Sequence, residues 1–319
     1  MKISIIGGGP AGLYFANAIK TAIPSARVSV YEVRNESVSS FGLGYTLQEL
    51  NTTLLQRLDK NYYSALFPEG STPPITKALF KTNNHQRTVD FSKGFSITRF
   101  ELMRYLRELS ESLGVDIIEK KINPKELNAL QASSDLLIGA DGVNSIVRSH
   151  YAQGLQTESH TADLKHSWFT NESPQKRTEA CFYAFKAPEG VVMMTSYPLS
   201  ENMQVVIVEM SSHCAKSGRF KGKSPDESVP YLNEILRQNG DDIALKSADL
   251  PWYAFKMNTT QNLSHNNVTL LGDAAASFHF SSGQGVTSAF TMGYTLAQCL
   301  LKNTDIASAL QHYSKAIEL

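Results

Sequence analysis

A glycine-rich turn near the N-terminus constrains the fold of this chain more than any other feature. Residues 2–6 (KISII) are a short β-branched run that predicts a buried strand, and residues 10–21 have the apolar spacing of a helix. Between them stands the pattern Gly7-x-Gly9-x-x-Gly12. The first glycine permits a tight turn, the second lets the backbone approach a pyrophosphate, and the third lets helix and strand pack closely.

An acidic residue at a suitable distance strengthens this interpretation. A second strand is predicted over residues 27–31, and Glu32 ends it, 20 residues after Gly12. In such βαβ units the helix N-terminus attracts phosphate, and the acid accepts hydrogen bonds from ribose hydroxyls. The N-terminal segment therefore predicts a dinucleotide site. A glycine-rich turn without a ligand is the alternative.

The composition narrows the class of protein. The chain has 319 residues, 42% of them hydrophobic, with 30 Lys and Arg against 30 Asp and Glu, so its formal net charge is zero. A neutral chain gives no electrostatic case for binding nucleic acid or an acidic membrane. Cys181, Cys214 and Cys299 are far apart and predict neither a disulfide framework nor a metal site. No targeting signal or spanning segment is recognisable, so we expect a soluble cytoplasmic protein.

The predicted elements divide the chain into two interleaved parts. Strands and helices alternate at the start, in the middle and at the end, whereas the stretches between them alternate like antiparallel strands. We therefore expect an α/β chain (α+β overall), in which a Rossmann-like domain is interleaved with an antiparallel-sheet domain. The first comprises residues 1–70, 98–158 and 265–319. The second, which is expected to hold the substrate, comprises residues 71–97 and 159–264.

Two further motifs and an arginine extend the pattern. Residues 137–148 (LIGADGVNSIVR) and 270–275 (LLGDAA) both run from a predicted strand into a turn, and Arg99 opens an amphipathic helix over residues 99–113. Together with the glycine turn, these motifs resemble the signatures of the FAD-dependent aromatic hydroxylases. These are the group A flavoprotein monooxygenases, which share the p-hydroxybenzoate hydroxylase fold. The resemblance covers the whole chain in the same order.

One branch of that family is more similar than the others. It contains the salicylyl-CoA and aminobenzoyl-CoA hydroxylases and the tryptophan hydroxylase of the violacein pathway. Four short segments carry the likeness: residues 41–44 (FGLG), Trp168, residues 208–209 (VE) and residues 279–281 (HFS). Members of this branch place a hydroxyl group on an activated or amine-bearing aromatic ring.

The resemblance implies an oxidoreductase, a monooxygenase whose FAD is reduced transiently by NADH or NADPH. O2 then gives a flavin hydroperoxide, whose distal oxygen hydroxylates an aromatic small molecule, while the protein orients the ring and excludes water. An exposed surface side chain is the alternative for Arg34, and a turn without a ligand is the alternative for Asp141. The residues that the resemblance assigns to FAD are Gly7, Gly9, Ala11, Gly12, Glu32, Arg34, Arg99, Asp141, Asp273, Gly283, Gln284, Gly285 and Val286.

Aromatic side chains are expected to line the substrate pocket. The candidates are Tyr45, Trp168, Tyr183 and Phe278, and packing in the core is the alternative for each. His279 lies in the loop that the resemblance places beside the flavin. There it would bond a phenol or an amine and assist its deprotonation, with a purely structural histidine as the alternative. No metal ligands and no oligomeric state are predicted.

Two other functions stay open from the sequence. One is a related flavoprotein with different chemistry, such as a reductase, a halogenase-like enzyme or an enzyme fed by free reduced flavin. A halogenase of this fold would carry a Trp-x-Trp-x-Ile-Pro segment, and residues 251–255 are PWYAF instead. The other is an FAD-binding protein without catalysis, which is motivated by Ala276, where the family usually has histidine.

Overall fold

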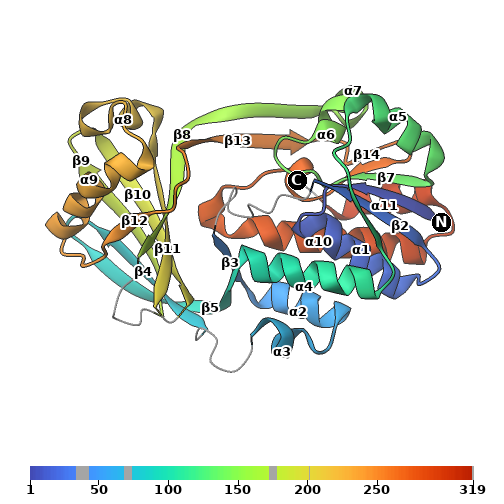
Figure 1. Cartoon of the computed structure of the whole chain (residues 1–319), viewed down its shortest axis with the longest axis horizontal. Helices are drawn as coiled ribbons and strands as arrows, with labels where there is room; N and C mark the ends of the chain where they lie inside the picture. The colour runs from blue at the N-terminus through green and yellow to red at the C-terminus, as the bar shows by residue number, and fades with distance from the viewer. Residues whose placement is uncertain (34–42, 68–73, 172–177, 201, 318–319) are drawn as a thin grey trace.

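Two β-sheets share one interrupted chain in this computed structural model (Figure 1). Helices gather around the smaller sheet on the right of Figure 1, and the larger sheet stands on the left. The long strands β8 (Thr157–Asn171) and β13 (Tyr253–Thr260) run between the two halves. The interleaved α/β architecture predicted from the sequence is confirmed, while the exact domain boundaries stay a prediction. The structure describes residues 1–33, 43–67, 74–171, 178–200 and 202–317.

The smaller sheet has the strand order β14-β15-β7-β1-β2-β6. Its neighbouring strands are parallel except at the edge, where β14 runs antiparallel to β15. Apolar side chains are buried on both faces of the central strands, as in parallel sheets covered by helices. The strands are β14 (Ser264–His265), β15 (Val268–Leu270), β7 (Leu136–Gly139), β1 (Lys2–Ile6), β2 (Arg27–Glu32) and β6 (Asp116–Glu119).

Helix α1 (Pro10–Ala22) is the central helix of this half. The Tyr14 ring stacks on Phe290 of α10 with ring centroids 4.5 Å apart, and Asn17 Nδ2 donates to the Leu106 carbonyl of α4 at 2.9 Å. These contacts hold the N-terminus of α1 at the carboxyl end of β1. The other helices of this half are α2 (Glu49–Leu58), α3 (Tyr62–Leu66), α4 (Arg99–Ser112), α5 (Pro124–Ser133), α6 (Ile146–His150), α7 (Ala152–Leu155), α10 (Gln284–Lys302) and α11 (Ile306–Ala316).

The larger sheet has the strand order β12-β8-β11-β10-β9-β4-β5-β3, and β13 pairs with β8 off this path. Its neighbouring strands are antiparallel, except that β4 and β9 are parallel. The remaining strands are β3 (Gly44–Leu47), β4 (Ile75–Thr82), β5 (Gln86–Thr98), β9 (Ala180–Ala187), β10 (Gly190–Ser200), β11 (Met203–Ser211) and β12 (Leu245–Ser247).

Strand β3 corrects one sequence prediction. Glycines at 42 and 44 predict a loop over residues 41–47, yet Gly44–Leu47 pairs antiparallel with β5, and Tyr45 lies opposite Ile97. Strand formation here depends on the partner strand, which local glycine content does not reveal. Residues 41 and 42 lie outside the described residues.

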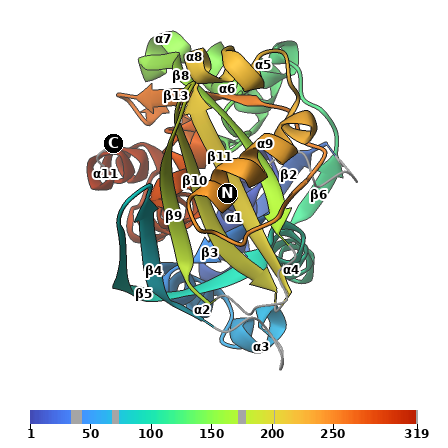
Figure 2. The same cartoon turned by 90° about the vertical axis from the view of Figure 1, so that its left-hand side faces the viewer.

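The two faces of the larger sheet have different neighbours. One face packs against α9 (Pro225–Gln238), which lies across the sheet in Figure 2, and their buried side chains form one core cluster. The opposite face carries a separate apolar cluster and is directed toward the smaller sheet. Successive side chains of a strand point to opposite faces, so Phe169 lies in the α9 cluster and Trp168 on the opposite face.

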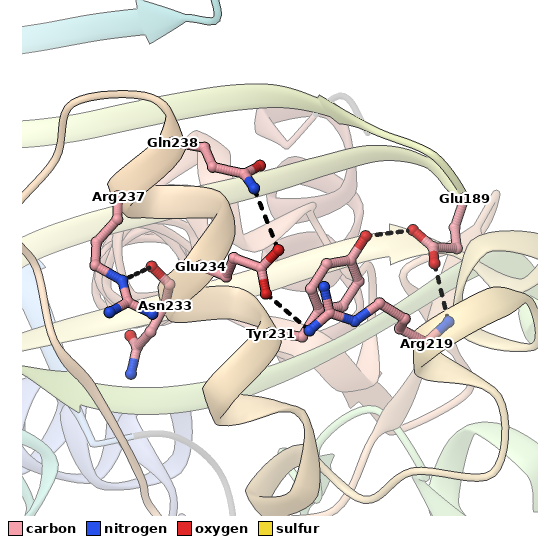
Figure 3. Close-up of polar contacts among 7 residues, drawn as sticks. All are labelled: Glu189, Arg219, Tyr231, Asn233, Glu234, Arg237 and Gln238. Atoms are coloured by element: carbon pink, nitrogen blue, oxygen red, sulfur yellow. Dashed lines mark hydrogen bonds and ion pairs between the residues drawn. The ribbon is translucent and has the colours of Figure 1, made fainter.

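A polar cluster fastens α9 at the outer end of this half (Figure 3). Arg219, in the short helix η2 (Gly218–Phe220), pairs with Glu234 at 2.8 Å and lies 3.8 Å from the centroid of the Tyr231 ring. Tyr231 Oη donates to Glu189 at 2.6 Å, and the Arg219 amide donates to Glu189 at 2.9 Å. Because these contacts join the β9–β10 turn, η2 and α9 to one another, we assign them to packing. The short helix α8 (Ser212–Ala215) precedes η2.

Within the part of the chain that the structure describes, no helix combines the length and apolarity needed to cross a bilayer. Among the same residues, His, Cys, Asp and Glu side chains do not gather in threes in a way that would hold a metal ion. A large cavity between the two sheets is the more prominent chemical feature.

Candidate active site

The cavity between the two sheets has a volume of about 1400 Å³. The β1–α1 turn and β2 form one end, the segments after β7 and β15 form the middle, and the inward face of the larger sheet forms the far end. Pockets for single small ligands measure about 300–1,000 Å³. The cavity therefore has room for an extended ligand and a smaller one together.

The three glycines of the β1–α1 turn have different tasks. Gly7 has a φ of +106°, and a Cβ there would lie 2.3 Å from the Ala140 carbonyl oxygen. A Cβ on Gly12 would lie 2.0 Å from the Gly7 carbonyl oxygen. In contrast, a Cβ on Gly9 would meet no heavy atom within 4 Å, and Gly9 lines the cavity. The outer two glycines are thus required by packing, whereas Gly9 leaves open space at the start of α1.

That open space lies at an uncapped helix N-terminus. Gly9 is the N-cap of α1 and has no side chain to accept from the first amides, and Pro10 follows in the first turn. Free amides and the positive end of the helix dipole favour an anion at this place. Ala11 also lines the cavity.

Glu32 stands beside the glycine turn, at the end of β2. Its Oε2 accepts from the Gly8 amide at 2.5 Å, and its Oε1 accepts from the Val33 amide at 2.8 Å. The carboxylate also lines the cavity, as the 20-residue spacing from Gly12 predicts. Arg34, which the sequence also indicated, lies outside the described residues.

Asp141 serves as a helix cap at the cavity wall. Its carboxylate accepts from Ser145 Oγ at 2.5 Å and from the Ile146 amide at 2.7 Å. Burial raises the pKa of Asp141, and these hydrogen bonds oppose the rise. The Asp-Gly turn therefore has a structural task, the capping of α6, in addition to its place on the cavity wall.

Arg148 ties the second motif to the third. Its guanidinium is buried and donates to the Val143 carbonyl at 2.7 Å and the Ala274 carbonyl at 2.9 Å. A longer contact of 3.4 Å reaches the carbonyl of Asp273. Because planar guanidinium donors hold several acceptors in a fixed geometry, Arg148 sets the position of the backbone that carries Asp273.

Arg99 reaches the cavity from the first residue of α4. Thr98 caps this helix, since its Oγ1 accepts from the Glu101 amide at 3.1 Å, and the cap fixes where Arg99 emerges. Arg99 Nη1 donates to the Tyr45 hydroxyl, so the cation and the β3 aromatic ring are held together on one wall. Arg99 thus opens the helix as the sequence predicts, and its contact with the cofactor stays a prediction.

Asp273 faces the middle of the cavity. It follows β15 in the short helix η3 (Gly272–Ala274), and its side chain is exposed on the cavity wall. The protein around this part of the cavity desolvates the carboxyl group and raises the pKa of Asp273 to about 6, although the nearby Arg99 and Arg148 lower it.

Helix α10 points its N-terminus at the same region. It begins at Gln284, and its N-cap Gly283 has a φ of +64°, which glycine adopts without strain. Gly283, Gly285 and Val286 line the cavity, whereas Gln284 is absent from its described lining. The first amides of α10 have no side-chain cap, so a second positive helix end faces the cavity. The short helix η4 (Phe280–Ser282) leads into it.

The aromatic wall agrees in part with the sequence. Tyr45, Trp168 and Phe278 line the cavity. Tyr183 does not line it, because its ring is 2% exposed and packs against Phe185 in the α9 cluster. Its neighbour Phe182 faces the cavity instead, as strand alternation requires.

His279 is also absent from the described lining of the cavity. Its Nε2 lies 2.9 Å from Oε2 of the buried Glu209, and its Nδ1 lies 2.7 Å from Ser281 Oγ. It stands between two cavity-lining neighbours, Phe278 and Phe280, and its side chain is 31% exposed. The catalytic role of His279 stays a prediction, and the contacts of its ring with Glu209 and Ser281 are also what the structural alternative requires.

His166 lines the cavity, although no sequence motif pointed to it. It precedes Trp168 by two residues on β8, so both side chains share the inward face, and this spacing was the available signal. Burial lowers the pKa of His166 to about 4, although the nearby Glu209 carboxylate raises it. The imidazole is therefore neutral at pH 7.

Comparison with known proteins decides which extended ligand this geometry serves. The sequence model of the FAD binding domain family matches residues 116–316. The chain belongs to this family. FAD is accordingly its cofactor.

The relatives of this FAD-binding chain include several oxygenases. It is 27% identical over 310 residues to the salicyloyl-CoA 5-hydroxylase of a Streptomyces species. This alignment covers 94% of this chain and 58% of that protein. It is 25% identical to the protodeoxyviolaceinate monooxygenase of Chromobacterium violaceum, over 99% of this chain and 83% of that protein. Among solved structures, tetrameric 2-methyl-3-hydroxypyridine-5-carboxylic acid oxygenase has the same fold, with a TM-score of 0.75 at 20% identity, over 99% of this chain and 86% of that one.

The residues at the cavity suit FAD. The open space at Gly9 and the uncapped start of α1 match the diphosphate, and Glu32 stands beside them. The uncapped start of α10 meets the opposite part of the cavity. Ala276, where the family usually has histidine, is buried and is not part of the described lining, so this departure leaves the cavity wall itself intact.

Replacing Asp273 by asparagine is expected to stabilise the apoprotein at neutral pH but not at acidic pH. The folded-state pKa of about 6 exceeds the unfolded value of 3.8, so the folded state holds the proton more tightly and wild-type stability falls as the pH rises from about 4 to 6. The asparagine variant does not lose stability in this way, because its side chain does not titrate. Its urea midpoint relative to wild type should therefore rise through that window and level off above it, and a difference independent of pH would contradict this account.

Proposed function

We propose that the chain is an FAD-dependent monooxygenase that hydroxylates an aromatic small molecule, using NADH or NADPH as the reductant and O2 as the oxidant, in the cytoplasm. The observation that supports this best is that one cavity joins the FAD site to a wall of aromatic rings. Trp168, Phe182 and Tyr253 belong to that wall. An aromatic ring held there shares one cavity with the cofactor site.

We further propose how the residues divide the work of binding. The α1 N-terminus at Gly9 would hold the diphosphate, and Glu32 the ribose hydroxyls. Asp273 and Arg99 would contact the middle of the cofactor, and the start of α10 at Gly285 would face its ring system. Gly12 supports this site through packing, since its own surface faces the Gly7 backbone.

When bound and reduced, FAD supplies the transfer of one oxygen atom from O2 to an electron-rich ring. No protein nucleophile is needed for such chemistry. The aromatic side chains would orient the ring and keep water out of the site. The names of the relatives support this class of reaction, since one is a salicyloyl-CoA 5-hydroxylase and another a protodeoxyviolaceinate monooxygenase.

The test is oxidation of NADH and NADPH by the purified, FAD-loaded protein in air, with and without aromatic compounds. The panel is anthranilate, indole and salicyl thioesters, and products are identified by mass spectrometry. We expect at least one compound to stimulate NAD(P)H oxidation and to appear in hydroxylated form. Stimulated oxidation without a hydroxylated product would favour a reductase or another flavin chemistry. FAD binding with no oxidation at all would favour a non-catalytic binding protein.

A further inference from the structure

The imidazole of His166 is almost fully buried, and one of its nitrogens has no hydrogen-bond partner among the described residues. Its exposed fraction is 7%, and its Nδ1 is buried with no hydrogen-bond partner among the described residues. More than nine in ten buried polar groups in folded proteins have a partner, so such an atom calls for an explanation. Nδ1 itself has no exposed surface, so the nitrogen that a ligand in the cavity can meet is the other one, Nε2.

Aromatic rings surround this imidazole on several sides. Ring centroids lie 5.1 Å away for Trp168, 4.9 Å for Phe280 and 5.9 Å for Tyr253. All three of these residues line the cavity as well. A planar aromatic ligand at this wall would contact apolar faces and meet the imidazole as a polar group.

Charge sets a further condition on that ligand. The cavity-lining residues that strands β8 to β11 contribute from the described part of the chain include no Lys, Arg, Asp or Glu. Lys256 of β13 lines the cavity, but its Nζ donates to Asn144 at 2.6 Å. On the opposite wall, Arg99 contacts Tyr45. A free carboxylate on the ligand would thus find no ready counter-charge at the wall that holds His166.

We propose that His166 recognises the substrate through a hydrogen bond to an N–H or O–H group on its aromatic ring, so that the site takes uncharged aromatic amines, indoles or phenols in preference to aromatic carboxylates. This inference rests on the proposed function and names its substrate class. A neutral imidazole has one donor and one acceptor nitrogen, and it pairs with such groups without a charge. Glu209 lies opposite His166 in the β8–β11 pair. Its carboxylate pairs with the imidazole of His279.

The test measures equilibrium binding to the FAD-loaded protein without NAD(P)H, by calorimetry and by the change in the absorption of the bound flavin. Indole is compared with indene, which has nearly the same shape without the N–H group, and 2-naphthol is compared with naphthalene. We expect wild type to bind the hydrogen-bonding member of a pair about tenfold more tightly. The substitution His166→Phe should reduce that ratio to near one, and His166→Gln should restore part of it. Indole-3-carboxylate should bind more weakly than indole.

His160→Phe is the matched control, because His160 is exposed on the same strand and is not part of the described lining of the cavity. It should leave the binding ratios unchanged. An unchanged ratio in His166→Phe, tighter binding of the carboxylate, or no binding of both indole and 2-naphthol would overturn the inference. If the ratio depends on His166 but no hydroxylated product ever forms, the proposed function fails while the recognition stands. If product forms and His166→Phe binds like wild type, the proposed function stands and the recognition by His166 fails.

Discussion

Replacing Gly12 by alanine is expected to destabilise the protein and to abolish its binding of FAD. The new Cβ would lie 2.0 Å from the Gly7 carbonyl oxygen and 3.3 Å from Ala140 Cβ. The first of these contacts is with backbone, so helix α1 must move away from β1. Overpacking of this kind costs about 1–3 kcal/mol, and the displacement also disturbs the turn at the cofactor site. Urea unfolding of the apoprotein and flavin absorption of the purified protein measure the two effects.

Gly9→Ala is the control that separates packing from ligand binding. Gly9 has φ and ψ of −77° and −174°, which alanine adopts freely, and its Cβ would enter open space in the cavity. Apoprotein stability should stay within about 1 kcal/mol of wild type. FAD affinity should fall by about tenfold or more, because the methyl group occupies the space at the start of α1. Equal losses of stability in the two variants would contradict the different tasks assigned to these glycines.

Replacing Arg148 by methionine is the second change with a large expected effect. The side chain is 5% exposed, and its guanidinium donates hydrogen bonds to the carbonyls of Val143 and Ala274. Methionine fills much of the volume but donates nothing, so these buried acceptors lose their partner. We expect a loss of about 2–4 kcal/mol in the free energy of unfolding.

The same substitution should weaken FAD binding, since the segment that carries Asp273 loses its link to α6. Arg237→Met on α9 serves as the control, because Arg237 is exposed and lies outside the described lining of the cavity. Its stability should stay within about 0.5 kcal/mol of wild type. If Arg148→Met bound FAD as tightly as wild type, Arg148 would be a stabilising residue alone and would not position the cofactor site.

The features that the sequence predicts best are local ones. The strand, turn and helix over residues 2–22, with Glu32 nearby, depend on short-range pattern and on backbone chemistry that only glycine satisfies, and the structure has them in place. Arg99 likewise follows from the apolar spacing of the amphipathic helix that it opens.

The substrate wall depends instead on which face of the larger sheet meets the smaller one. Tyr183 and Phe182 are adjacent in β9, and the sequence does not tell which of them faces inward. The same uncertainty hid His166, which shares its face with Trp168. His279 lies between two residues that line the cavity, but its ring pairs with the carboxylate of Glu209, which is distant in sequence. Each of these outcomes is set by tertiary packing, which local patterns do not encode.

The central claim is that FAD bound in this cavity passes oxygen from O2 to an aromatic ring held at the wall of the larger sheet. The most direct test is a turnover with NAD(P)H under O2 labelled with heavy oxygen, using an aromatic compound that stimulates NAD(P)H oxidation. The account predicts that one labelled oxygen atom appears in the hydroxylated product. A product whose new oxygen comes from water, or reductant oxidation that leaves the aromatic compound unchanged, would contradict it.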